Sequence, residues 1–146
     1  MWTAFSEISA AVRALGLSEQ QFCQLPNRQG ECILREIKAT FLAGRSPFFW
    51  WEHYDGADFW EPPRQGYELL EALCPEPEVY LVPHGEDSEC VYVSSPATIS
   101  KVLGECAAFE YSLVGPKLDW IVTETHHESI AVLGDRAKAE LRRIRA

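Results

Sequence analysis

Apolar residues recur every three or four positions in the first third of the chain, which is the spacing of amphipathic helices. This pattern predicts one helix over residues 2–15 and another over about 28–43, each followed by a glycine that suits a helix end. Between them, Ser18 and Gln21 have the spacing of a capping box, so a short helix is also predicted there.

Alternation of apolar and polar residues, which is typical of strands, dominates the second half. Residues 78–83 and 89–94 predict a hairpin joined by a polar loop. A second hairpin is predicted around Gly115, and residues 129–133 predict one more strand. The aromatic run 47–54 favours a strand or an extended segment.

Shorter helices complete the pattern. They are predicted over 67–73 and about 96–104, and a last helix follows Gly134 and ends in basic residues. This order predicts a single domain over residues 1–146 of the α+β class. We expect an antiparallel or mixed sheet of hairpins, with the N-terminal helices first and the helices packed on one face.

Composition narrows the setting of this domain. The chain has 146 residues and is 47% hydrophobic, which is enough to bury a core without disulfides or metals. It has no apolar run near the ~20 residues of a membrane span and no secretory signal, so we expect no membrane contact. The five cysteines are widely spaced and never form a C-x-x-C pair, which favours reduced thiols in a cytoplasmic protein.

Acidic residues are concentrated in one segment. The formal net charge is −9, which disfavours binding to nucleic acid. From Trp50 to Cys90 there are eleven acids and one base, Arg64, so this segment carries −10. Two interpretations stay open: a solvated face that aids solubility, or a surface that attracts a basic protein.

Three tryptophans lie inside this acidic segment. Trp50 and Trp51 are adjacent, so they cannot both face one side of a strand, and Trp60 follows nearby. They either pack in the core or anchor a protein interface, where tryptophan is enriched. In the second interpretation the partner-binding residues are Trp51, Glu52, Asp55, Asp58, Trp60, Glu61, Glu86 and Asp87.

The most chemically suggestive stretch is His126-His127-Glu128, because imidazoles and carboxylates serve as metal ligands and general bases. On a strand the two imidazoles would point to opposite faces, so both could bind one ion only where the strand ends. The alternative is a strand end where one imidazole bonds backbone groups and packs on Trp120. No phosphate-binding loop or other common catalytic motif is present, and we expect no cofactor.

The chain resembles a family of small bacterial proteins. The resemblance rests on Phe109-Glu110-Tyr111, Leu118-Asp119-Trp120-Ile121, Glu124-Thr125-His126-His127, Val132-Leu133-Gly134 and Phe49-Trp50-Trp51-Glu52. In size, acidity and helix-then-hairpin order, such families look similar to immunity proteins of bacterial polymorphic toxin systems, including the SUKH group.

That resemblance implies a cytoplasmic protein that binds and neutralises a cognate toxin, a basic protein, through the acidic, tryptophan-bearing surface. Two other functions stay open. One is a small metal-dependent or hydrolytic enzyme centred on His126, His127 and Glu128. The other is a structural or regulatory subunit that forms a homodimer.

Overall fold

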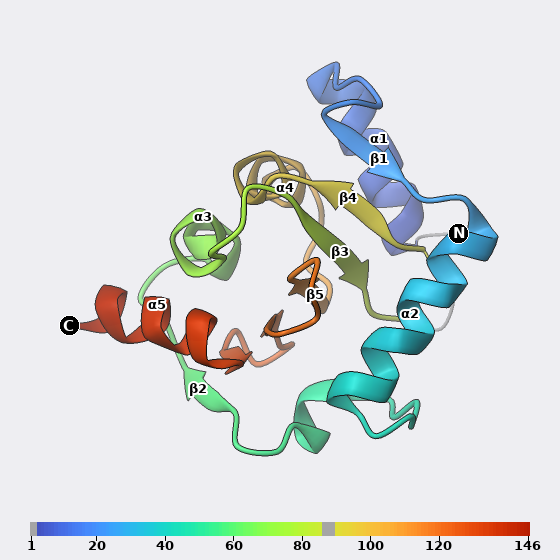
Figure 1. Ribbon diagram of the computed structural model, residues 1–146. Helices are drawn as coiled ribbons and strands as arrows, with labels where there is room; N and C mark the ends of the chain where they lie inside the picture. The colour runs from blue at the N-terminus through green and yellow to red at the C-terminus, as the bar shows by residue number, and fades with distance from the viewer. Residues whose placement is uncertain (1–2, 86–89) are drawn as a thin grey trace.

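The computed structural model describes residues 3–85 and 90–146, which form one seven-stranded antiparallel sheet and the helices around it (Figure 1). The helices are α1 (Ala4–Leu15), α2 (Asn27–Phe41), α3 (Leu70–Leu73), α4 (Pro96–Gly104), α5 (Asp135–Arg145) and the 3-10 helices η1 (Trp50–His53) and η2 (Gly66–Leu69). The strands are β1 (Phe22–Gln24), β2 (Asp58–Trp60), β3 (Val79–Pro83), β4 (Tyr92–Ser94), β5 (Tyr111–Val114), β6 (Ile121–Glu124) and β7 (Ile130–Leu133). Their order across the sheet is β1-β4-β3-β5-β6-β7-β2.

Successive residues of the central strands point into two separate apolar clusters. Leu81 and Leu113 belong to the cluster that also includes residues of α1, α3, α4 and α5. Their neighbours Val82 and Val114 belong to the cluster that α2 and η1 cover. Figure 1 accordingly shows α2 across the strands from α3, α4 and α5. Because both faces are covered, polar strand residues on the α2 side are buried as well.

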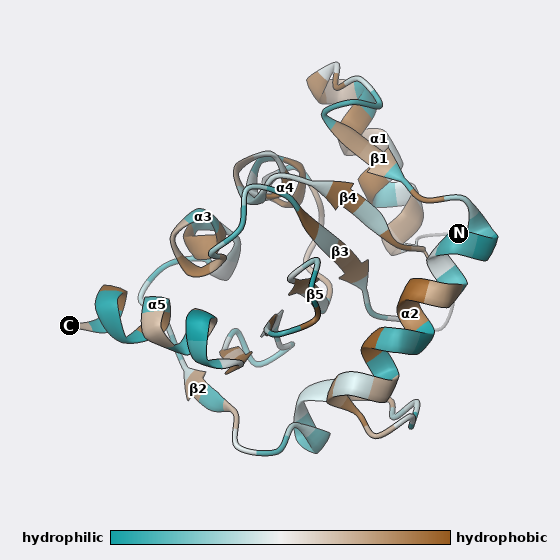
Figure 2. Ribbon diagram, viewed as in Figure 1, coloured by the Kyte–Doolittle hydropathy of each residue, from teal (hydrophilic) through white to brown (hydrophobic). Residues whose placement is uncertain are grey.

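The α+β class and the antiparallel sheet are confirmed. The expectation of helices on one face holds for α1, α3, α4 and α5, whereas α2 lies on the other face. The apolar stripe of α2, with Leu34 and Ile37 buried, needs a partner, and the face bearing Val82 and Val114 provides it. In Figure 2, apolar residues run along β3, which is covered on both faces, whereas polar residues cover much of α5.

Two local predictions are wrong. The short helix at Ser18 is a turn, in which Gln21 Oε1 accepts a hydrogen bond from the Ser18 amide before β1 pairs with β4. The aromatic run 47–54 contains η1 instead of a strand. One helical turn brings Trp50 and Tyr54 into the same cluster, whereas a strand would separate them by about 13 Å.

Candidate functional site

The site lies at the end of the sheet where β5 begins and β6 ends, because Tyr111 pairs with Glu124. Beyond β6 the chain forms a tight turn, in which the Thr125 amide donates to the Ser129 carbonyl and Glu128 has a left-handed φ of 60°. His126 and His127 are therefore on a turn. Their rings lie 4.0 Å apart, so the expectation of opposite faces is wrong for this stretch.

Glu110, just before β5, is held by three donors. Its Oε2 accepts hydrogen bonds from Trp51 Nε1 at 3.0 Å, the His126 amide at 2.6 Å and His126 Nδ1 at 2.6 Å. The Glu110 side chain is 10% exposed, and that of His126 is 43% exposed. This contact gives the neutral His126 ring its proton on Nδ1, which leaves Nε2 as the atom that can accept a proton.

Aromatic rings enclose this pair. Phe49 lies 4.7 Å from the His126 ring, and Trp51 lies 5.8 Å from His126 and 5.6 Å from His127. The imidazoles therefore do not pack on Trp120 as the alternative interpretation proposed, because Trp120 belongs to the cluster on the other face. The His126 ring does not bond a backbone group either: its Nδ1 bonds the Glu110 carboxylate, which also accepts from the His126 amide.

A chain of buried polar side chains runs beneath the site. His84 Nε2 lies 2.7 Å from Ser112 Oγ, which lies 2.6 Å from Thr123 Oγ1, and Tyr54 Oη lies 2.7 Å from the same Thr123 oxygen. Burial lowers the pKa of His84 to about 3, so its ring is neutral. Burial raises the pKa of Tyr54 to about 12, so its hydroxyl keeps its proton.

Sequence reasoning missed this chain. Ser112 and Thr123 occupy the polar positions of alternating strands, which normally face solvent. Here they are fully buried, because α2 and η1 cover their face. Tyr54 and His84 were visible in the sequence as polar residues at the borders of predicted strands. Nothing in the sequence pattern indicated that they contact Ser112 and Thr123.

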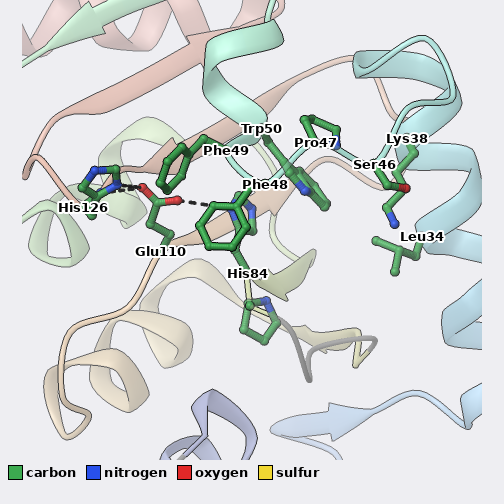
Figure 3. A pocket seen from close by; sticks show the side chains of 12 residues that line it. Leu34, Lys38, Ser46, Pro47, Phe48, Phe49, Trp50, His84, Glu110 and His126 are labelled. Atoms are coloured by element: carbon green, nitrogen blue, oxygen red, sulfur yellow. Dashed lines mark hydrogen bonds and ion pairs between the residues drawn. The ribbon is translucent and has the colours of Figure 1, made fainter.

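A cleft of about 400 Å³ opens beside Glu110 and His126 (Figure 3). Its walls come from α2, the segment before η1, the end of β3 and the start of β5. In Figure 3, Glu110 and His126 lie at one end, Lys38 and Ser46 at the other, and aromatic side chains lie between them. We call this space the aromatic cleft.

A second space, of about 440 Å³, lies at the same end of the sheet and is acidic. Its ionisable lining residues are Glu61, Arg64, Glu68, Glu124, His127 and Glu128, and we call it the acidic hollow. Glu124 Oε1 accepts a hydrogen bond from the Tyr111 hydroxyl at 2.6 Å, and its Oε2 accepts one from the Gly66 amide at 3.2 Å. Burial, with a smaller contribution from nearby Glu128, raises the pKa of Glu124 above its ordinary value.

The predicted partner-binding residues are not gathered in one place: Glu61 lines the acidic hollow, whereas Asp58 lies in the depression lined by Arg142 and Arg145. Glu52, Asp55 and Glu61 are exposed, and Asp58 is half-buried on β2. Trp51 and Trp60 are both half-buried, and each packs against one of the two core clusters. The large apolar side chains that are exposed near the acidic segment are Phe48 (73%) and Phe59 (49%). Glu86 and Asp87 lie outside the described residues.

The basic helix α5 offsets part of the acidic segment. Arg142 and Arg145 line the same surface depression as Asp58. Arg136 contacts Glu76 and Asp119 through its guanidinium. At the acidic hollow, four glutamates share one arginine, Arg64, which forms an ion pair with Glu68 at 3.5 Å.

The predicted metal set does not converge. Across residues 3–85 and 90–146, no three His, Cys, Asp or Glu side chains are arranged to hold a metal ion. Glu128 is exposed and borders the acidic hollow, whereas His126 is engaged by Glu110. His126 and Glu110 thus form the pair that the structure brings together in place of His126, His127 and Glu128.

The fold and the site define a small α+β protein with a Glu–His pair between an aromatic cleft and an acidic hollow. The chain belongs to DUF6756, a family of unknown function whose signature covers residues 1–145. No curated protein and no solved structure matches the chain. Among the described helices, none has the length and apolar character needed to cross a membrane.

Proposed function

We propose that this protein is a cytoplasmic inhibitor of the bacterial immunity type, which binds a basic toxin and blocks it. The observation that carries the proposal is the acidic hollow, where Glu61, Glu68, Glu124 and Glu128 face one arginine and one histidine. Acidic surfaces accelerate association with basic partners and reject acidic ones.

The Glu124 carboxylate also favours binding of a cation at this surface. Its carboxylate is partly buried, and its raised pKa means that holding the negative charge there costs free energy. An arginine or lysine side chain of a partner, placed between Glu124 and Glu128, would relieve that cost. The exposed carboxylates Glu52 and Asp55 would contribute to long-range attraction.

Trp51 and Trp60 have a different role in this proposal from that of exposed anchors. Trp51 donates its indole N–H to Glu110, and Trp60 packs against the core, so both shape the surface from below. Phe59, exposed on the edge strand β2, is better placed to enter a hydrophobic pocket of a partner.

Charge reversal tests the proposal. Glu61→Lys combined with Glu128→Lys should slow association with the partner about tenfold, because steering depends on the local field. Asp55→Lys with Asp58→Lys should slow it less, since Arg142 and Arg145 already offset Asp58. The measurement is stopped-flow association with the basic protein that the wild type captures in a pull-down, at several salt concentrations.

The matched control is Glu19→Lys with Glu36→Lys, which makes the same charge change at exposed positions away from the hollow. We expect the control to associate nearly as fast as the wild type, and wild-type association to slow as salt rises. If the Glu19/Glu36 control slows association as much as the Glu61/Glu128 variant, or if association does not depend on salt, the acidic hollow is not the binding surface.

A second candidate function is hydrolysis, and the Glu110–His126 contact at 2.6 Å favours it. A carboxylate that orients an imidazole is the usual arrangement of a general base, which removes a proton from water. The aromatic cleft beside the pair could hold a substrate.

This candidate predicts that ester or phosphoester hydrolysis, if found, is lost in His126→Ala and reduced in Glu110→Gln. His127→Ala is the control, because His127 lies beside the pair without bonding to Glu110 in the structure described. Activity that survives His126→Ala would assign the hydrolysis to a contaminant or another site.

A further inference from the structure

His84 has a buried ring nitrogen without a partner. Its side chain is 4% exposed, and among the described residues no group forms a hydrogen bond with Nδ1. Glu110 Oε1 lies 4.0 Å from Nδ1, which is too long for a hydrogen bond. Both residues line the aromatic cleft. Buried polar atoms without partners are uncommon, so this one needs an explanation.

The polar chain beneath the cleft decides whether Nδ1 carries a proton. If each hydroxyl donates toward His84, Tyr54 donates to Thr123, Thr123 to Ser112 and Ser112 to Nε2. The His84 proton then lies on Nδ1 and points toward the Glu110 carboxylate, which is favourable. If Nε2 carried the proton instead, the Nδ1 lone pair would face the carboxylate, which is unfavourable. His84 therefore presents an N–H beside a carboxylate oxygen.

We propose that the aromatic cleft binds an aromatic acid that carries a hydroxyl group, a hydroxyaryl carboxylate. The hydroxyl would accept a hydrogen bond from His84 Nδ1 and donate one to Glu110 Oε1. Two such bonds, of about 2.9 Å and 2.7 Å, together exceed the 4.0 Å between these atoms, so one oxygen can reach both.

Other residues of the cleft are suited to the aromatic ring and the carboxylate of this ligand. Phe48, Phe49 and Trp50 line it and offer ring faces for an aromatic body. Lys38 lies at the end opposite Glu110 and can pair with the carboxylate (Figure 3). The volume, about 400 Å³, is within the usual range for small-molecule sites.

His84 Nδ1 is sealed from solvent, so the hydroxyl must displace a side chain as it binds. Phe48, 73% exposed, is the least buried aromatic residue of the cleft, so moving it breaks the fewest packing contacts. This inference does not depend on toxin binding, because the cleft and the acidic hollow have separate linings.

The test is calorimetry with 4-hydroxyphenyl acids that have zero, one or two methylenes between ring and carboxylate. For the member that binds best, removing or methylating the hydroxyl should weaken binding about tenfold or more, because a hydrogen bond to a charged group is lost. Replacing the carboxylate with a primary amide should also weaken it. Hydroxyl-independent binding, or no binding by any of the three acids, would overturn the assignment.

Variants give a second readout. Lys38→Met should weaken binding about tenfold, whereas Lys117→Met, the same change outside the cleft, should leave it unchanged. His84→Phe should abolish the preference for the hydroxyl while retaining weak binding of the ring. If His84→Phe does not fold, the hydroxyl and methoxy comparison on the wild type decides the question. Equal effects of the two lysine variants would show that Lys38 is not the carboxylate partner.

Discussion

Trp120→Ala is expected to lower the free energy of unfolding by about 3–5 kcal/mol. Trp120 is fully buried, and it is the largest fully buried side chain in the described part of the protein. It precedes β6 and packs in the cluster beneath α1, α3, α4 and α5. Removing the indole leaves a cavity, and the cost rises with the part of that cavity that cannot collapse.

Two glycines show how tightly the surroundings fit Trp120. A Cβ on Gly115 would lie 2.4 Å from the indole Nε1, and a Cβ on Gly134 would lie 2.7 Å from the Trp120 Cα. Gly134 also has a left-handed φ of 95°. Backbone therefore closes over the tryptophan from both sides, and this backbone cannot move in without breaking the pairing of β5, β6 and β7.

The measurement is urea unfolding of the wild type and Trp120→Ala, followed by far-ultraviolet circular dichroism. Phe59→Ala is the matched control, because Phe59 is a 49% exposed aromatic on an edge strand and its loss should cost far less. A Trp120→Ala variant as stable as the wild type would mean that the indole is not part of the core.

The elements predicted best were those with a strong local period. The alternation through Leu113 and Val122 identified β5 and β6, because one set of positions contacts the helices of one face. The apolar stripe of α2 and the proline at the start of α4 predicted these two helices for the same reason: the signal lies within one element.

The remaining features depend on contacts between distant segments. β2 lies between two turn signals and forms because Phe59 pairs with Ala131, 72 positions later in the sequence. Likewise, Ser112 and Thr123 have the pattern of solvent-facing residues, and only the packing of α2 makes them buried. The Glu110–His126 pair forms because His126 lies on a turn after β6. The alternating sequence pattern instead placed His126 on a strand or at its end.

Acid is expected to destabilise the protein through His84. Burial holds its pKa in the folded state at about 3, below the ordinary value of 6.5. Between these values the unfolded chain takes up a proton that the folded protein does not, so stability falls as pH falls. The contribution of His84 is complete above pH 6.5 and is lost on the way down to pH 3, at about 1.4 kcal/mol per pH unit.

Other groups near the site affect this dependence differently. Glu124 has a raised pKa, so its protonation favours the folded state as pH falls and partly opposes the His84 effect. Tyr54 does not titrate in this range, because its pKa is about 12. The effect of His84 must therefore be read as a difference between variants, each of which retains Glu124.

His84→Gln should flatten the acid limb of the stability curve, because its amide can still bond Ser112 but takes up no proton. Between pH 6.5 and 4.5, the wild type should lose about 2–3 kcal/mol more than the variant. Urea unfolding at half-unit pH intervals measures both curves, and His53→Gln, which removes an exposed histidine, is the control. Parallel curves for wild type and His84→Gln would mean that His84 accepts a proton in the folded state as readily as in the unfolded chain, and that it is not held neutral beneath the cleft.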